Sequence, residues 1–149
     1  MITKPCPICA KPMKQLWSSF YCDCKKEVKE TTISTFSNPE EAYEYAVCNG
    51  SSEESRLAAC KDSKYAFWYA EHVDKCPRDE TRKGACKDPI YAYCYADDID
   101  KCSRDDTRKA ACKDPEYAYW YAKDVDKCKH PDTEQAVKGS SFEEDYKKI

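Results

Sequence analysis

Residues 55–132 read SRLAACKDSKYAFWYAEHVDKCPRDE, TRKGACKDPIYAYCYADDIDKCSRDD and TRKAACKDPEYAYWYAKDVDKCKHPD, which are three 26-residue copies without a gap. The first cysteine of each copy recurs at this period, as Cys60, Cys86 and Cys112. A fixed period of this length is typical of stacked-repeat proteins, in which no unit buries its apolar face alone. Such chains usually present a binding surface, so this stretch predicts architecture more directly than activity.

Each copy contains the start signal of a helix. Asp62, Asp88 and Asp114 are followed by serine or proline, and an aspartate N-cap before a proline favours a helix start. At 100° per residue, the apolar residues that follow share one face about 140° wide. In the first copy, this expected buried stripe is Tyr65, Ala66, Tyr69, Ala70 and Val73.

The segment upstream of each start signal, TRKGAC or TRKAAC, predicts a shorter helix of small residues. Small side chains let a neighbouring helix approach closely, while large rings on the partner fill the layer. Only a Lys–Asp junction separates the two helices, so they form a tight αα-hairpin. The sequence therefore predicts a mostly α chain, an α-solenoid of about 26-residue helical-hairpin repeats.

The array extends beyond its full copies. NPEEAYEYA, at residues 38–46, matches DPEYAYWYA, but Glu41 and Glu44 replace the aromatic residues at the positions of Tyr65 and Trp68. This pattern suits a polar terminal cap. The predicted helical domain, 31–149, contains a degenerate cap (38–50), repeats 55–80, 81–106 and 107–132, and a C-terminal capping helix (133–149).

This pattern, a small-residue helix followed by one carrying a Tyr–Ala pair, resembles the short tandem helical repeats, mostly uncharacterised, of some bacterial and viral proteins. The resemblance covers Asn38 to about Val137. It implies a right-handed α-solenoid and implies no activity.

The N-terminal stretch CPICAKPMKQLWSSFYCDC contains four candidate metal ligands, Cys6, Cys9, Cys22 and Cys24. Zn²⁺ favours four thiolates in a tetrahedron, and two hairpin turns can supply them in pairs. The aromatic-rich stretch between the pairs suits two strands. The first pair resembles the knuckle of a zinc ribbon, whereas the second pair, C-x-C, departs from that family's C-x₂-C.

We therefore expect a small β zinc ribbon over residues 1–30 that binds one structural Zn²⁺, with metal binding and folding as one event. Four unligated cysteines and a rubredoxin-like iron site are the alternatives. For the eight remaining cysteines we expect reduced core thiols, with disulfides between neighbouring repeats or additional metal as alternatives. A Cys60–Cys76 bridge is disfavoured, because a 12-residue helix separates its ends by about 18 Å, whereas bridged Cα atoms lie within about 7 Å.

Composition and motifs argue against several functions. The net charge of −3 excludes nucleic-acid binding that is driven mainly by the electrostatic attraction of the whole chain. No apolar run of membrane-spanning length and no secretory signal occurs, and the many cysteines then indicate a reducing, cytoplasmic location. The chain contains no Gly-rich phosphate loop and no nucleophile or HExxH motif, and His72 and His130 occur singly. We therefore expect that this chain is not an enzyme.

Three functions remain open. In the first, aromatic rows on the longer helices bind a protein partner, through Phe67, Trp68, Tyr93, Tyr119 and Trp120. Such a protein would suit a small regulator or inhibitor of a larger complex, with a viral origin as one option. Burial of both rows between repeats is the alternative. In the second, the basic ribbon binds nucleic acid through Lys11, Lys14, Trp17, Lys25 and Lys26. The third is a structural homo-oligomer joined through its repeat ends.

Overall fold

The computed structural model describes residues 14–16, 19–21 and 36–149. The chain divides into two units, residues 1–33 and 34–149. In the first unit, strands β1 (Lys14–Leu16) and β2 (Ser19–Tyr21) pair antiparallel, with Lys14 opposite Tyr21. The four cysteines predicted to bind zinc lie outside the described residues.

The described part of the second unit is helical. Its α-helices are α1 (Pro39–Asn49), α2 (Glu53–Ala59), α3 (Ser63–Trp68), α4 (Asp79–Ala85), α5 (Pro89–Cys94), α6 (Asp105–Ala111), α7 (Pro115–Trp120), α8 (Pro131–Val137) and α9 (Glu143–Tyr146). Three π-helical segments continue α3, α5 and α7 without a break: η2 (Tyr69–Asp74), η3 (Tyr95–Asp100) and η4 (Tyr121–Asp126). Each 26-residue copy is thus a short helix followed by a long one, so the predicted tandem helical hairpins are confirmed.

The predicted start signals of the long helices are also confirmed. The Asp62 carboxylate accepts hydrogen bonds from the backbone N–H groups of Lys64 and Tyr65. Asp88 and Asp114 cap α5 and α7 in the same way, each with a proline in the first turn. These side chains satisfy N–H groups that have no partner inside the helix.

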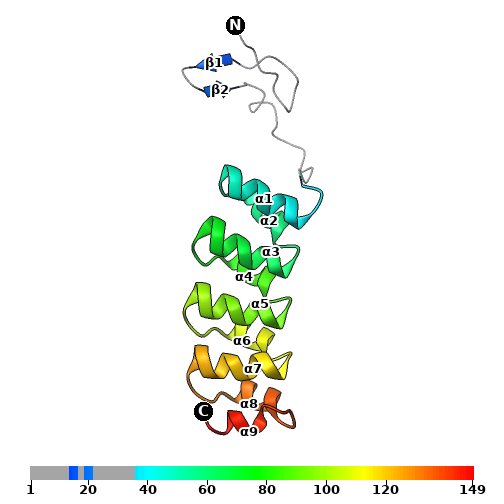
Figure 1. Cartoon of the computed structure of the whole chain (residues 1–149), viewed down its shortest axis with the longest axis vertical. Coiled ribbons are helices and arrows are strands. Elements are labelled where there is room, and N and C mark those ends of the chain that lie inside the picture. The colour runs from blue at the N-terminus through cyan, green and yellow to red at the C-terminus, as the bar shows by residue number, and fades with distance from the viewer. Residues whose placement is uncertain (1–13, 17–18, 22–35) are drawn as a thin grey trace. The chain divides into compact units, whose positions relative to one another are not determined.

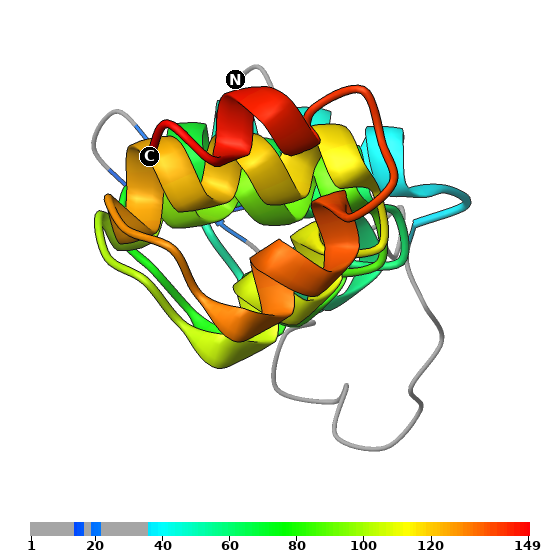
Figure 2. The same cartoon turned by 90° about the horizontal axis from the view of Figure 1, so that it is seen from below.

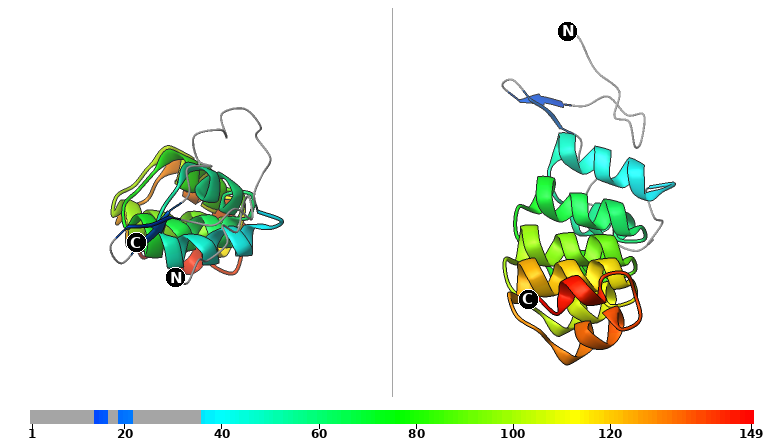
Figure 3. Two further views of the ribbon diagram at one scale, coloured as in Figure 1. Left: turned by 90° about the horizontal axis from the view of Figure 1, so that it is seen from above. Right: turned by 60° about the horizontal axis from the view of Figure 1, so that its bottom comes forward.

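The hairpins of residues 36–149 stack one on the next (Figure 1). Seen along the stack, the long helices form one layer and the short helices form a second (Figure 2). The tilted view in Figure 3 shows the same succession from α1 to α9. Each long helix packs its fully buried alanines, such as Ala66 and Ala70, against the short helix of the following hairpin.

Small residues make this close packing possible. At Gly84 of α4, an added Cβ would lie only 2.6 Å from the Cβ of Ala66. The neighbouring repeats carry Ala58 and Ala110 at the equivalent position, and both are buried. The expectation that small residues let the helices approach closely is therefore confirmed at this contact.

The predicted buried stripe is only partly right. Ala66, Tyr69 and Ala70 are fully buried, whereas Tyr65 and Val73 keep part of their surface exposed. Both side chains still pack against buried core residues, so the stripe faces the core and only its two ends are incompletely covered. From Tyr69 on, the winding is π-helical, with i→i+5 hydrogen bonds that add about one residue to each turn.

Each π segment ends at a lysine in the left-handed region, with φ of 53° at Lys75, 53° at Lys101 and 55° at Lys127. This conformation crowds the Cβ of an L-residue and favours glycine. It lets the chain leave the long helix and turn back toward the next short one.

Replacement of Lys101 by glycine should therefore raise the free energy of unfolding by about 1 kcal/mol, since glycine adopts positive φ without the Cβ clash. Urea unfolding monitored by circular dichroism measures the change. Lys109→Gly is the matched control, because Lys109 is an exposed lysine inside α6, where glycine should cost about 1 kcal/mol. A loss of stability in both variants would contradict the prediction.

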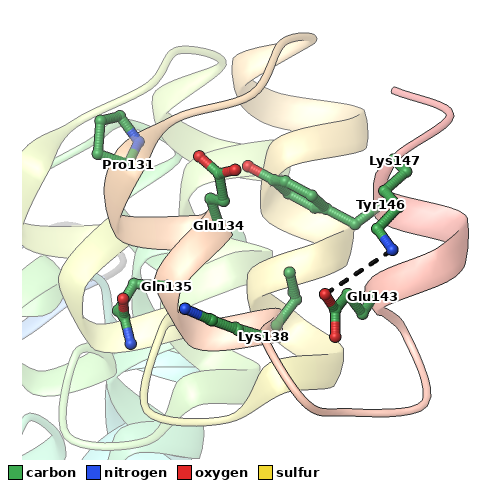
Figure 4. A pocket seen from close by; sticks show the side chains of 8 residues that line it. Pro131, Glu134, Gln135, Lys138, Glu143, Tyr146 and Lys147 are labelled. Atoms are coloured by element: carbon green, nitrogen blue, oxygen red, sulfur yellow. Dashed lines mark ion pairs between the residues drawn. The ribbon is translucent and has the colours of Figure 1, made fainter.

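The last helix of the array, α9, carries charged residues at positions where the full hairpins carry buried alanines. Tyr146 takes the place of Tyr121, since its hydroxyl bonds to Thr133 as that of Tyr121 bonds to Thr107. Counted from these tyrosines, Glu143 and Lys147 occupy the positions of the buried alanines Ala118 and Ala122. Both line a hollow of about 390 Å³ between α8 and α9, and their charged groups lie 3.8 Å apart (Figure 4). The end thus offers charge where a further hairpin, or a second copy, would need alanines.

Candidate protein-binding face

A buried polar contact recurs in every hairpin. The hydroxyl of Tyr95, which is fully buried, lies 2.7 Å from the hydroxyl of Thr81. It also accepts from the N–H of Arg78 at 3.0 Å and donates to the carbonyl of the same residue at 3.1 Å. The equivalent hydroxyl pairs are Ser55–Tyr69, Thr107–Tyr121 and Thr133–Tyr146. A tyrosine of the long helix therefore caps the start of the short helix.

A buried ion pair locks the other end of each long helix to the same short helix. Nε and Nη2 of Arg82 donate to the two carboxylate oxygens of Asp100 at 2.8 and 2.7 Å. Their side chains are 6% and 2% exposed, and the bond to Asp100 raises the pKa of Arg82 above its ordinary value. Arg56–Asp74 and Arg108–Asp126 repeat the contact. These pairs hold the hairpins rigid, so they belong to the scaffold.

Asp74 gives this ion pair a pH dependence. Burial alone would raise the pKa of this carboxyl, but bonds from Arg56 and Ser51 outweigh burial and hold it below its ordinary value. The unfolded chain then takes up the proton first as the pH falls, so the stability that Asp74 contributes is present above about pH 4 and is lost below it.

We therefore expect Asp74→Asn to be less stable than the parent chain at pH 7, with the difference shrinking as the pH falls below about 4. Urea unfolding of both proteins between pH 7 and pH 2.5 (about the practical limit) measures it. A difference that stays constant over this range would contradict the prediction.

The first aromatic row predicted to bind a partner serves the contacts between hairpins. Phe67 is only 8% exposed, so its ring offers little surface to a partner. Each member of the row packs against a ring that follows in the chain, with centroid distances of 6.1 Å for Phe67–Tyr91, 6.2 Å for Tyr93–Tyr117 and 5.7 Å for Tyr119–Phe142. Tyr93 also donates to Asp124 at 3.0 Å. This row connects successive hairpins.

The second row keeps part of its surface exposed, as Tyr93 and Tyr119 of the first row do, and its indoles also contact rings, with centroid distances of 5.8 Å for Trp68–Tyr43 and 5.1 Å for Trp120–Tyr119. Trp68 and Trp120 are half-buried, and Cys94 takes the equivalent place in the middle hairpin. They lie on the outer face, which we define as the second, third, sixth, ninth and tenth residues of α1 and of the three long helices. Every one of these residues is exposed or half-buried. The tyrosines of the outer face are Tyr65, Tyr91 and Tyr117.

The outer face is acidic. It carries eight carboxylates, Glu40, Glu41, Glu44, Glu71, Asp97, Asp98, Glu116 and Asp124, and two lysines, Lys64 and Lys123. Asp97 and Asp98 lie inside η3, in the C-terminal half of a continuous helix, where a negative charge opposes the helix dipole.

The described cysteines fall into two groups, and the expectation of core thiols is wrong for one of them. Cys48, Cys76, Cys102 and Cys128 are exposed. Cys60, Cys86, Cys94 and Cys112 are half-buried, and burial raises the pKa of each to about 11. Thiols of such high pKa hold little thiolate at neutral pH, so they are poor nucleophiles and poor ligands.

Other features of the described residues bear on the remaining predictions. Among the described residues, no group of three or more His, Cys, Asp or Glu side chains could hold a metal ion. No described helix has both the length and the apolar character that a bilayer crossing requires. Of the residues predicted to bind nucleic acid, Lys14 lies in β1, and Lys11, Trp17, Lys25 and Lys26 lie outside the described part.

The sequence analysis missed the Tyr–Thr contact and the Arg–Asp pair, although a signal was present. A threonine or serine precedes a tyrosine by 14 residues, and an arginine precedes an aspartate by 18, in each full copy. No protein-family model, curated protein or solved structure matches this chain.

Proposed function

We propose that this chain is a non-enzymatic scaffold that binds a protein partner through the outer face of its long helices. The observation that carries the proposal is the half-buried row that includes Trp68 and Trp120, in which part of each side chain remains exposed to solvent. Large aromatic side chains on a surface are the residues that dominate binding energy at protein interfaces. A small regulator or inhibitor of a larger complex would suit a protein of 149 residues.

The rigidity of the stack supports the same proposal. Buried ion pairs and buried tyrosine hydroxyls fix each long helix against its short helix, as Arg82–Asp100 and Thr81–Tyr95 do in the middle hairpin. Side chains on such a scaffold lose little conformational freedom on binding, and preorganisation of this kind lowers the entropic cost of association.

Site-specific crosslinking tests the proposal. A photoreactive residue in place of Glu116, on the outer face, should crosslink to a defined protein in an extract of the organism that encodes the chain. The same residue in place of Lys109, which is exposed on the short helix α6, is the matched control. Equal crosslinking from both positions, or none from Glu116, would overturn the proposal.

We also propose one structural Zn²⁺ bound by Cys6, Cys9, Cys22 and Cys24, on the strength of their spacing. Elemental analysis of the purified chain should find about one zinc per molecule, and the Cys9→Ser/Cys22→Ser variant should hold almost none. Unchanged metal content in the variant would overturn the assignment.

A further inference from the structure

We propose that the occupant of the outer face is a basic, extended segment of the partner, with arginine or lysine at about every third residue. This inference rests on the proposed function and adds the chemistry of the partner. It follows from three properties of the face: its indoles accept cations, its centre is acidic, and its repeat spacing matches an extended chain.

Both indoles of the outer face already hold an ammonium group. The Nζ atom of Lys64 lies 4.3 Å from the ring centroid of Trp68, and that of Lys123 lies 4.6 Å from the ring centroid of Trp120. These distances fall within the range of cation–π attraction. Trp68 and Trp120 are themselves half-buried, so the part of each ring that remains exposed is open to an arginine or lysine side chain of a partner.

The middle hairpin lacks both the ring and the lysine. Cys94 stands where the flanking hairpins carry tryptophan, Ile90 stands at the position of Lys64, and Asp97 stands at the position of Lys123. Asp97 and the exposed Asp98 gain nothing from the helix dipole. The result is an acidic centre between two cation-binding rings, and a cation from outside the chain is the group that complements it.

The charge of the whole face points the same way. Eight carboxylates against two lysines make the outer face more negative than the chain as a whole, whose net charge is −3. Such a surface attracts a basic partner and speeds its association. It repels nucleic acid, whose binding depends on neutralising phosphates with lysine and arginine.

The spacing of the hairpins sets the spacing of the partner's cations. Neighbouring long helices contact one another, and packed helices lie about 8–10 Å apart. A segment in the extended polyproline II conformation advances by about 3.1 Å per residue with three residues per turn, so every third side chain points to the same side and three residues span about one hairpin. Cations at every third residue would therefore meet successive hairpins in register.

Binding of synthetic peptides to the full chain tests the inference. The matched probe is a ten-residue peptide with arginine at every third position and serine elsewhere. Two further peptides carry glutamate in place of arginine, or the same arginines in one contiguous block. Calorimetry at low salt should show the matched peptide binding on the order of tenfold tighter than the block peptide. The glutamate peptide should show no binding.

Two variants, each of which removes two negative charges, locate the site. Asp97→Asn/Asp98→Asn should weaken binding of the matched peptide on the order of tenfold. Glu53→Gln/Glu54→Gln removes the same charge from exposed positions of α2, on the short-helix layer, and should leave the affinity unchanged. Equal affinity for the matched and glutamate peptides, or an Asp97/Asp98 variant that binds like the parent, would overturn the inference.

The two proposals fail separately. Crosslinking from position 116 to a protein, combined with no affinity for the matched peptide, would retain the scaffold and reject a basic partner. Loss of both the crosslink and the peptide affinity would reject both proposals. Tight binding of the block peptide as well as the matched one would reject the register and with it the extended segment.

Discussion

Replacement of Arg82 by alanine is expected to lower the free energy of unfolding by about 3–5 kcal/mol. The substitution leaves the carboxylate of Asp100, whose side chain is only 2% exposed, without the two hydrogen bonds that compensate its burial. Arg82 also donates to Asp79 at 2.7 Å and lies over the ring of Tyr95. One side chain thus ties the start of the short helix to the end of the long one.

Arg104→Ala is the control for this prediction. Arg104 is the N-cap residue of α6, its side chain is 45% exposed, and its ion pair with Asp106 is 3.7 Å long. An exposed pair of this kind contributes about 1 kcal/mol or less. Chemical unfolding of both variants gives the comparison, and equal losses would contradict a structural role for the buried pair.

A double replacement separates charge from packing. Arg82→Met/Asp100→Leu removes both charges and keeps much of the buried volume, so it should recover a large part of the stability lost in Arg82→Ala. If the double variant is as unstable as the single one, the lost stability comes from packing, and the uncompensated carboxylate is not its cause.

The helical hairpins could be predicted because their signals are local. Asp88 before Pro89 starts a helix whatever surrounds it, and the 26-residue period fixes how often the signal recurs. The π-helical winding of Tyr95–Asp100 has no such signal. A helical wheel drawn at 100° per residue assumes α-helical winding throughout, so it could not show this change.

The candidate site was predictable only to the level of two aromatic rows. On a helical wheel both rows flank the buried stripe, so the sequence could not tell which one faces solvent. Stacking distinguishes them, because Phe67 packs against Tyr91 of the following hairpin, whereas Trp68 contacts Tyr43 of α1 and the ammonium group of Lys64. The acidic outer face was hidden for the same reason, since its members come from four separate helices.

The capping role of tyrosine explains why two short helices carry an arginine at the N-cap position. Arg78 and Arg104 occupy the N-cap positions of α4 and α6, and neither side chain caps its helix. The hydroxyl of Tyr95 takes over this task by binding the backbone N–H and carbonyl of Arg78. The N-cap position is therefore free to carry an exposed charge, and the cap forms only when the hairpin closes.

Tyr95→Phe should therefore cost about 1–3 kcal/mol, although it removes a single oxygen atom. The ring keeps its packing, but the N–H of Arg78 loses its acceptor and the Thr81 hydroxyl loses a partner at 2.7 Å. Tyr45→Phe is the matched control, because Tyr45 holds the same place in α1 and is 49% exposed, so water can replace its hydroxyl contacts. Urea unfolding compares the two variants, and a loss at Tyr95 no larger than that at Tyr45 would show that the hydroxyl is not the cap.

Because the cap joins residues of two helices, its loss should also reduce the cooperativity of unfolding, seen as a lower dependence of the unfolding free energy on urea concentration.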